Sequence, residues 1–185
     1  MGGGFDAWSG LVSRRPIDRG VAVLQGDETP GEAIAIAYAM EEQARSGYEA
    51  LLRRNPEGEV ARLLDQLVGA EGGHLDLLRE RFDQGGYAGD LPGLAGAKAA
   101  QTEGGLSPEA FSRAVVASAG DAQELLETAM GMEVDSLDLY LQLSQRSEDP
   151  AAEEVFRTIA DGEVQHLRWL GERMGRTAGS ENGAG

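Results

Sequence analysis

The sequence predicts an all-α fold, a four-helix bundle made of two antiparallel helix hairpins with a long crossover that contains a short extra helix. Four long segments carry apolar residues at three- and four-residue spacing, and each begins at a recognisable helix start signal. Glycine, with 27 residues among 185, is concentrated at the ends and between residues 83 and 107. A chain of this length can bury one sizeable core, so we expect one main domain.

The first hairpin is expected to consist of helices over residues 30–54 and 56–82. Thr29 can cap the first helix, which then has proline in its first position and Glu32 to complete a capping box. Asn55 can cap the second helix in the same way, again ahead of a proline. Because the connection between them is short, the two helices should be antiparallel neighbours.

The second hairpin follows the glycine-rich stretch of residues 83–107, which is expected to form loops. A short helix is expected over residues 107–118, opened by a Ser-Pro pair and ended by a glycine. Asp121 then caps a third long helix that reaches about residue 146, and the Asp-Pro pair at 149–150 starts a fourth that ends near Met174.

These elements divide the chain into three parts. Residues 29–174 are expected to form the helical bundle. Residues 1–28 are expected to be an N-terminal arm or the remnant of a preceding domain. Residues 175–185 have the composition of a disordered tail.

The composition excludes several kinds of site and partner. With no cysteine, the chain cannot hold a disulfide, a thiolate metal site or a cysteine nucleophile, so its chemistry must come from oxygen and nitrogen ligands. Its 32 acidic and 16 basic residues give a formal net charge of −16, which argues against a nucleic-acid surface and is compatible with cations as ligands. No stretch is apolar enough for a membrane span, so we expect no membrane partner and a cytoplasmic location.

The two predicted hairpins repeat one another without a gap. The offset is 92 residues, from Glu41 to Glu133 and from His74 to His166 alike. A two-fold relation between the hairpins follows from this repeat. The matched pairs are Met40 and Met132, Glu41 and Glu133, Tyr48 and Tyr140, Leu51 and Leu143, Leu67 and Ile159, Glu71 and Glu163, His74 and His166, Leu75 and Leu167, and Leu78 and Leu170.

Several polar residues of this repeat interrupt the apolar faces of the helices, so they should point inward. Each Glu-x-x-His pair places a carboxylate and an imidazole one helical turn apart on one face. Burying ionised carboxylates without partners is costly, and the arginines lie mostly off these faces. Divalent metal ions that share bridging carboxylates would resolve the problem. The predicted metal ligands are Glu41, Glu71, His74, Glu133, Glu163 and His166.

Other residues near this set have two open interpretations. Tyr48 and Tyr140 each follow a predicted ligand glutamate by seven residues, so they either support a ligand carboxylate through the hydroxyl or simply fill the core. Gly72 and Gly73, between two predicted ligands, permit either close helix approach or a local distortion. Neighbouring acids such as Asp135 are expected on a solvated face.

The pattern Glu41…Tyr48, Glu71-x-x-His74, Glu133…Tyr140 and Glu163-x-x-His166 resembles the rubrerythrin branch of the ferritin-like superfamily, over Thr29 to about Met174. The resemblance implies two iron ions held by those glutamates and histidines, reaction with peroxide or dioxygen, and a homodimer. Two departures stand out. Typical rubrerythrins carry a further ligand glutamate where this chain has Ser136, and they have a cysteine-ligated domain that delivers electrons. Any electron donor should therefore be a separate molecule or domain.

A second resemblance lies at the start of the chain. Residues 3–10, with a glycine pair ahead of Ala7 and Trp8, look like the last turn of a rhodanese domain, a sulfurtransferase. If so, the chain is the C-terminal part of a rhodanese–rubrerythrin fusion, or a relative that lost the front domain. The alternative is an ordinary arm that packs on the bundle through Trp8 and Leu11.

Three functions are compatible with these residues. The first is an oxidoreductase in which two ferrous ions react with peroxide or dioxygen and are reduced again by an outside donor. The second is a metal-binding or storage protein without turnover, which the serine at position 136 favours. The third is an accessory domain of a sulfurtransferase. Glutamate and histidine ligands suit iron, manganese and zinc alike, so the ligand set leaves the metal open.

Overall fold

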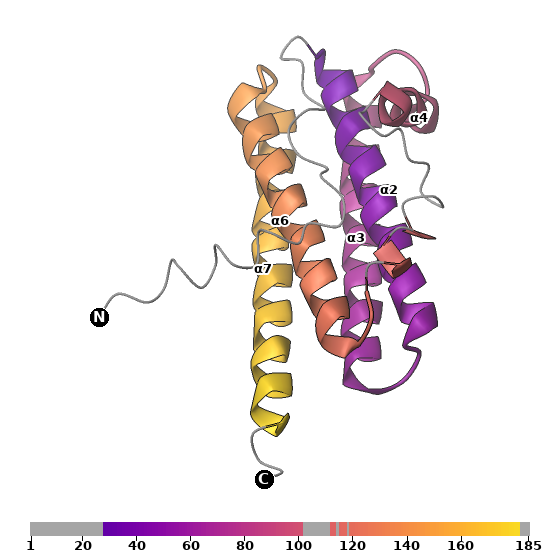
Figure 1. The fold of residues 1–185 in the computed structure, drawn as a ribbon. Coiled ribbons are helices and arrows are strands. Elements are labelled where there is room, and N and C mark those ends of the chain that lie inside the picture. Colours follow the sequence, from indigo (N-terminus) through magenta and orange to yellow (C-terminus); the bar gives the residue numbers. More distant parts are fainter. Residues whose placement is uncertain (1–27, 102–111, 114, 118, 182–185) are drawn as a thin grey trace, which may run out of the picture.

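The computed structural model describes residues 28–101, 112–113, 115–117 and 119–181, and the regular elements in these ranges are helices. This confirms the all-α prediction for the described part of the chain. Figure 1 shows the helices α2 (Pro30–Arg54), α3 (Gly58–Gly85), α4 (Leu91–Gln101), α6 (Ala122–Arg146) and α7 (Pro150–Glu181).

The predicted start signals of α2 and α6 are confirmed by their hydrogen bonds. The Thr29 hydroxyl accepts from the Glu32 amide at 3.3 Å, while the Glu32 carboxylate accepts from the Thr29 amide at 2.9 Å. Asp121 Oδ1 accepts from the Gln123 and Glu124 amides at 2.9 and 3.0 Å. These bonds satisfy amides that the first helical turn leaves without a partner.

The predicted start of α3 is wrong by two residues. Asn55 does not cap this helix; its amide instead donates to the Leu51 carbonyl and closes the last turn of α2. Glu57 is the N-cap residue and makes no side-chain cap bond. Gly58, with a φ of 86°, turns the chain into the new helix, which a start at Pro56 would not allow.

The expectation of loops throughout residues 83–107 is also wrong, because α4 lies within it. Gly93 and Gly96 disfavour a helix and hide α4 in the sequence, although its start has a cap, because Asp90 Oδ1 accepts from the Gly93 amide at 2.8 Å. Burial of Leu91 and Ala95 against the core outweighs those preferences. The short helix predicted over 107–118 is helical at residues 112–113 and 115–117, and the rest of it lies outside the described residues.

The helix α7 continues to Glu181, beyond the predicted end near Met174. The expected disordered tail is therefore wrong up to that residue, since the glycines there weaken a helix without breaking its hydrogen bonds. The proposed arm and the rhodanese-like segment, residues 1–27, lie outside the described residues.

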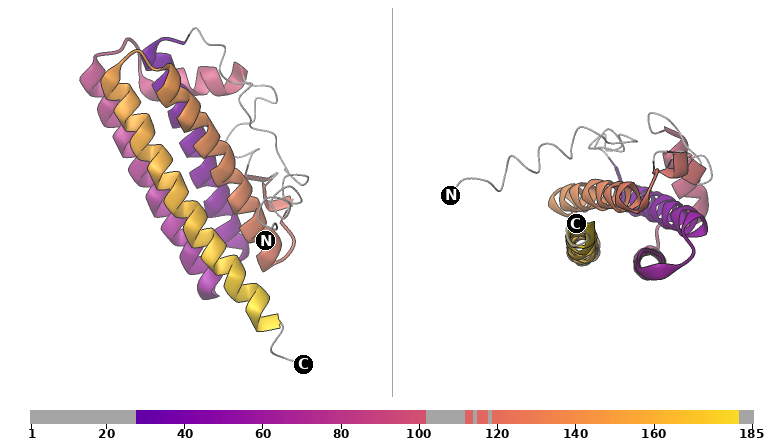
Figure 2. Two further views of the ribbon diagram at one scale, coloured as in Figure 1. Left: turned by 90° about the vertical axis from the view of Figure 1, so that its left-hand side faces the viewer. Right: turned by 60° about the horizontal axis from the view of Figure 1, so that its bottom comes forward.

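The long helices α2, α3, α6 and α7 lie side by side in all the views of Figures 1 and 2. The pairs in contact are α2 with α3, α3 with α7, α7 with α6, and α6 with α2, which closes a ring around a shared interior. The short helix α4 packs against α2 on the outside of this ring. Among the described helices, none combines the length and the apolar character that a membrane span requires.

The interior contains two apolar clusters with a polar layer between them. On α2 the first cluster reaches Met40, the second begins at Ala44, and Glu41 lies between. On α7 they are separated in the same way, around Glu163 and His166. The α4-side cluster includes Ile34, Met40, Leu78, Phe82, Leu91, Leu143, Phe156 and Ile159. The second cluster, on the side of the α2–α3 turn, includes Ala44, Leu51, Val60, Leu64, Leu67, Leu126, Met132 and Leu170.

Candidate metal centre

The polar layer brings together the six predicted ligands from four helices. The helix α2 supplies one glutamate and α6 another, while α3 and α7 each supply a Glu-x-x-His pair. All six residues are buried, with relative exposures between 0% for Glu41 and 8% for His74. Apolar clusters lie on both sides of these carboxylates. The layer consists of Glu41, Glu71, His74, Glu133, Glu163 and His166.

The six side chains form two groups that could each hold a metal ion. One group is Glu41, Glu71, His74 and Glu163, and the other is Glu71, Glu133, Glu163 and His166. Within each group, one ligand atom per residue lies within 4.8 Å of the others. Glu71 and Glu163 belong to both groups, so each could supply a ligand atom to either group.

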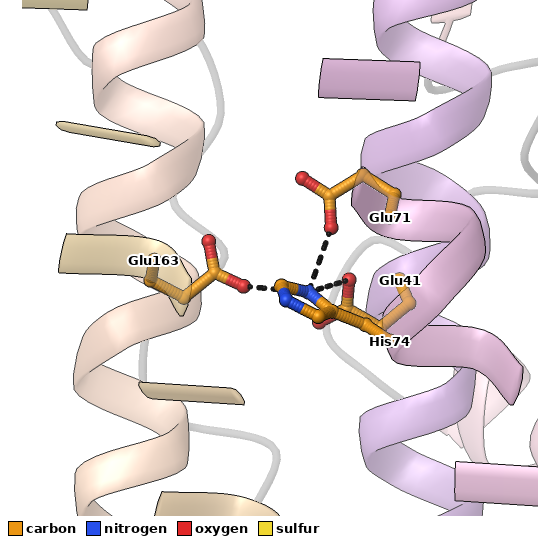
Figure 3. Close-up of side chains that lie close together, drawn as sticks. All are labelled: Glu41, Glu71, His74 and Glu163. Carbon is orange, nitrogen blue, oxygen red and sulfur yellow. Dashed lines mark hydrogen bonds and ion pairs between the residues drawn. The ribbon is translucent and has the colours of Figure 1, made fainter. Parts of the chain in front are cut away.

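The first group is arranged around the imidazole of His74, as Figure 3 shows. Its Nδ1 lies 3.3 Å from Glu41 Oε2, 3.1 Å from Glu71 Oε2 and 3.2 Å from Glu163 Oε1. These carboxylates come from three different helices. The imidazole therefore directs Nδ1 at the carboxylates, and Nδ1 is the nitrogen positioned to bind an ion.

The second group repeats the first under the offset found in the sequence. His166 Nδ1 lies 3.0 Å from Glu133 Oε2, 3.3 Å from Glu163 Oε2 and 3.5 Å from Glu71 Oε1. Each of these contacts has its counterpart around His74. The two imidazoles stack with 5.3 Å between ring centroids and an interplanar angle of 23°. The two-fold relation of the sequence repeat is thus also a relation between side-chain contacts.

Tyr48 and Tyr140, the two tyrosines matched by the repeat, each contact a predicted ligand glutamate of the other hairpin. The Tyr48 hydroxyl donates to Glu133, and the Tyr140 hydroxyl donates to Glu41. Both tyrosines are 0% exposed. The sequence left open whether these tyrosines support a ligand carboxylate or only fill the core. The structure contains the hydroxyl contacts that the first interpretation requires. The sequence alone placed each tyrosine beside the glutamate of its own helix and did not reveal this exchange.

The four carboxylates differ in how readily they ionise. Burial, together with the nearby charge of Glu41, raises the pKa of Glu71 well above its usual range. Burial and the charge of Glu133 raise the pKa of Glu163 in the same way. For Glu41 and Glu133, burial opposes ionisation, but the close contacts with the neighbouring glutamate and histidine outweigh it and lower the pKa.

The histidines and tyrosines respond to the same carboxylates. Burial works against a charged His74, but the contacts with Glu163, Glu41 and Glu71 raise its pKa. The pKa of His166 is also raised, because the contact with Glu133 outweighs burial. Burial and the adjacent carboxylates raise the pKa of Tyr48 and of Tyr140 well above 10, so their hydroxyls keep the proton.

The carboxylate of Glu163 shows that this layer suits a cation. Both of its oxygens are buried and have no hydrogen-bond partner, although Oε1 lies 3.2 Å from His74 Nδ1. Hydrogen-bond geometry is not met at that contact. A buried carboxylate without donors is costly, whereas an ion between the two groups would satisfy it. The donor set of carboxylate oxygens and imidazole nitrogens therefore fits bound metal.

Two residues differ from what the sequence predicted around the site. Asp135 is 8% exposed, so the prediction that it lies on a solvated face is wrong. Trp169 stacks on His166 with 5.4 Å between ring centroids, and the sequence analysis missed this contact. The signal available was its position three residues after a predicted ligand, which places both on one helical face.

Gly72 and Gly73 do not mark a close approach between helices. A Cβ atom at either position would meet nothing within 4 Å. The helix α3 also runs through both glycines without a break, so neither proposed reason for them is supported by the backbone.

Comparisons of the chain with protein-family models, with curated proteins and with solved structures gave no significant match. The resemblance to rubrerythrins therefore stays a prediction from the motif. What the structure adds is that the motif's residues meet in one buried cluster that could hold metal ions.

Proposed function

We propose that the protein is a di-iron carboxylate protein with a ferritin-like four-helix bundle, and that it reduces peroxide or dioxygen with electrons from a separate donor. The observation that carries this proposal is the pair of four-residue ligand groups that share Glu71 and Glu163. Two ligand groups joined by two carboxylates suit a pair of ions close together better than two independent ones.

The charges of the ligand set support a pair of divalent ions. Four ionised carboxylates balance two divalent cations, and two neutral imidazoles complete the set. When bound, ferrous ions would supply the electrons that peroxide or dioxygen takes up. Manganese and zinc accept the same ligands, so the assignment of iron rests on the resemblance to rubrerythrins.

The chain's own residues have distinct tasks in this proposal. Glu71 and Glu163 hold both ions, while the other two glutamates and the two histidines each hold one. The hydroxyls of Tyr48 and Tyr140 fix the carboxylates of Glu133 and Glu41 from the opposite hairpin. The apolar clusters keep bulk water away from the layer, which strengthens every electrostatic interaction within it.

A metal-binding protein without turnover is the second candidate, and Ser136 is the observation that favours it. This serine is 2% exposed and stands where typical rubrerythrins have a further ligand glutamate. A centre without that carboxylate has less capacity to change its ligands. Binding and turnover must therefore be measured separately.

Metal content per chain tests the binding step. Protein purified without chelator and then supplied with Fe(II) without oxygen should hold about two ions per chain by elemental analysis. The Glu71→Ala/His74→Ala double variant should hold one or fewer. A matched control is Asp76→Ala/Glu80→Ala, which removes two exposed acids from the same helix and should keep both ions. A native protein that takes up no Fe(II) would contradict the proposal.

Peroxide consumption tests the reaction. The iron-loaded protein, with ascorbate as electron donor, should consume peroxide through many cycles and faster than the same amount of free iron. Loading with two ions but no such turnover would support the second candidate. Loss of folding stability on chelation, without any reaction, would identify the ions as structural.

A further inference from the structure

We infer that Gly162 is the positioning residue for His74, and that the two halves of the metal layer are consequently inequivalent. This inference rests on the proposed metal binding. It concerns a residue that is not itself a ligand, and it predicts that one substitution on α7 disables one half of the site only.

The contact between Gly162 and His74 is closer than any side chain would allow. A Cβ atom built on Gly162 would lie 2.6 Å from His74 Nε2 and 3.1 Å from Cε1. The imidazole of α3 therefore occupies the space of the missing side chain on α7. With Nε2 against this backbone, Nδ1 faces Glu41, Glu71 and Glu163.

The sequence repeat does not extend to this contact. The position matched to Gly162 in the first hairpin is Ala70, which already carries a Cβ atom. The residue matched to Trp169, whose indole stacks on His166, is Leu77. One histidine is thus held against bare backbone and the other against an indole ring. The two halves of the repeat therefore have the same predicted ligands, but different groups orient their histidines.

Gly162 also stands where helix stability alone would favour another residue. Glycine inside a helix is less stable than alanine, and Gly162 lies well within α7. In the metal-free protein an alanine could be accommodated, because the atoms it meets belong to the end of a side chain that can rotate. With an ion on Nδ1 the imidazole would have no such freedom. An added methyl group should therefore act on metal binding and not on folding.

The experiment compares Gly162→Ala with Gly171→Ala in full-length protein that carries Trp8→Phe. Gly171 lies on the same helix, and a Cβ atom there meets only Met130 Cε, at 3.8 Å. The Trp8→Phe change leaves Trp169 as the one tryptophan of the chain. Co(II) is the probe, because it accepts oxygen and nitrogen ligands, resists air oxidation and quenches a nearby indole.

The parent protein should bind two Co(II) ions per chain, as should Gly171→Ala. In Gly162→Ala the affinity for one ion should fall by at least about tenfold, while the remaining ion still quenches Trp169. Without metal, the melting temperature of Gly162→Ala should be no lower than that of the parent. In a His74→Ala background, Gly162→Ala should have no further effect on Co(II) binding, because the residue it displaces is gone.

Full affinity for both ions in Gly162→Ala would overturn this inference and leave the proposed function standing. If Gly162→Ala loses the quenching of Trp169 as well as the affinity for one ion, Gly162 acts on the whole layer. That result would also overturn the inference. A further loss of binding in the His74→Ala background would do the same, since the effect would then not pass through His74. A parent protein that binds no Co(II), Fe(II) or Mn(II) would overturn the proposed function, and this inference with it.

Discussion

Among single residues, the pKa shifts of the buried layer favour protons held on some of its carboxyls and on its imidazoles when no ion is bound. The raised pKa values of Glu71 and Glu163 favour the protonated form of these two carboxyls, while the lowered pKa values of Glu41 and Glu133 favour ionisation. Two protonated histidines then balance two carboxylates. Two divalent ions would replace these protons, because four ionised carboxylates then balance the charge of the two ions.

This exchange predicts a pH dependence of metal binding. The four groups with raised pKa values, Glu71, Glu163, His74 and His166, each have to lose a proton before they can act as ligands. Affinity should therefore be higher at about pH 8 than at about pH 6, and binding should release protons. A Mn(II) titration in weakly buffered solution with a pH indicator measures the release. An affinity that is constant over this range would contradict the assignment of these protons.

The hydroxyls of the buried tyrosines give a second residue-scale prediction. Tyr48→Phe removes the donor to Glu133 and keeps the ring in the core, so metal affinity should fall by about tenfold with little change in stability. Tyr38→Phe is the matched control, because the Tyr38 hydroxyl contacts Arg79, at 2.7 Å, and no ligand. Competition with a metal-sensitive dye measures both. Equal affinities in the two variants would show that Tyr48 serves only to fill the core.

At the scale of the elements, Asp149 ties the start of α7 to the end of α3. Its Oδ1 accepts from the Ala151 amide at 3.0 Å, and its Oδ2 accepts from the Tyr87 hydroxyl at 2.5 Å and from Arg81. The hydrogen bond from Tyr87 and the one from Arg81 lower the pKa of Asp149 to about 2. One carboxylate thus joins the two helices that carry the Glu-x-x-His pairs.

Asp149→Ala should lower the free energy of unfolding by about 1–2 kcal/mol at neutral pH, through loss of the helix cap and of the bond to Tyr87. A lowered pKa means that this stabilisation is present above the unfolded value of 3.8 and is lost as pH falls toward 2. Urea unfolding at about pH 7 and pH 2.5 measures the difference. If the native protein and Asp149→Ala differ in free energy of unfolding as much at the lower pH as at neutral pH, the ionised carboxylate of Asp149 is not the source of the difference.

Local signals fix some helix ends and leave others open. Thr29 and Asp121 have the side chains and neighbours that a cap requires, so α2 and α6 begin where the sequence predicts. For α4 two glycines oppose a helix although Asp90 caps its start. The helix forms because Leu91 and Ala95 pack on apolar residues distant in the chain. The salt bridge between Lys98 and Glu32, at 2.7 Å, fixes it further to α2. Contacts of this kind cannot be seen in a window of sequence.

For the whole molecule, the polar layer interrupts the core at mid-length and is the place where stability depends on metal. Two apolar clusters flank it, so each hairpin is held to the other on both sides of the layer. Metal that binds only the folded chain should stabilise the whole structure, by about 2.7 kcal/mol for each site at free metal 100 times its Kd. Chelation should remove this increment without unfolding the chain.

Glu163→Gln separates folding from metal binding in the whole molecule. An amide matches a protonated carboxyl in shape, and the raised pKa of Glu163 favours the protonated form without metal, so the free energy of unfolding should change by about 1 kcal/mol or less. Added Mn(II) should raise the melting temperature of the native protein and have little effect on the variant. Glu172→Gln, on an exposed part of α7, is the control and should respond like the native protein. An equal metal response in all three would contradict a bridging role for Glu163.

The sequence by itself determined the helical class, most of the long helices and the six residues of the layer. It could do so because helical periodicity and a repeat at constant offset are properties of the chain read in order. Only the tertiary structure decided which hairpin each tyrosine serves, that Trp169 stacks on His166, and that Gly162 leaves room for His74. Those contacts join residues of different helices, or depend on how side chains turn, and both are set by packing between helices.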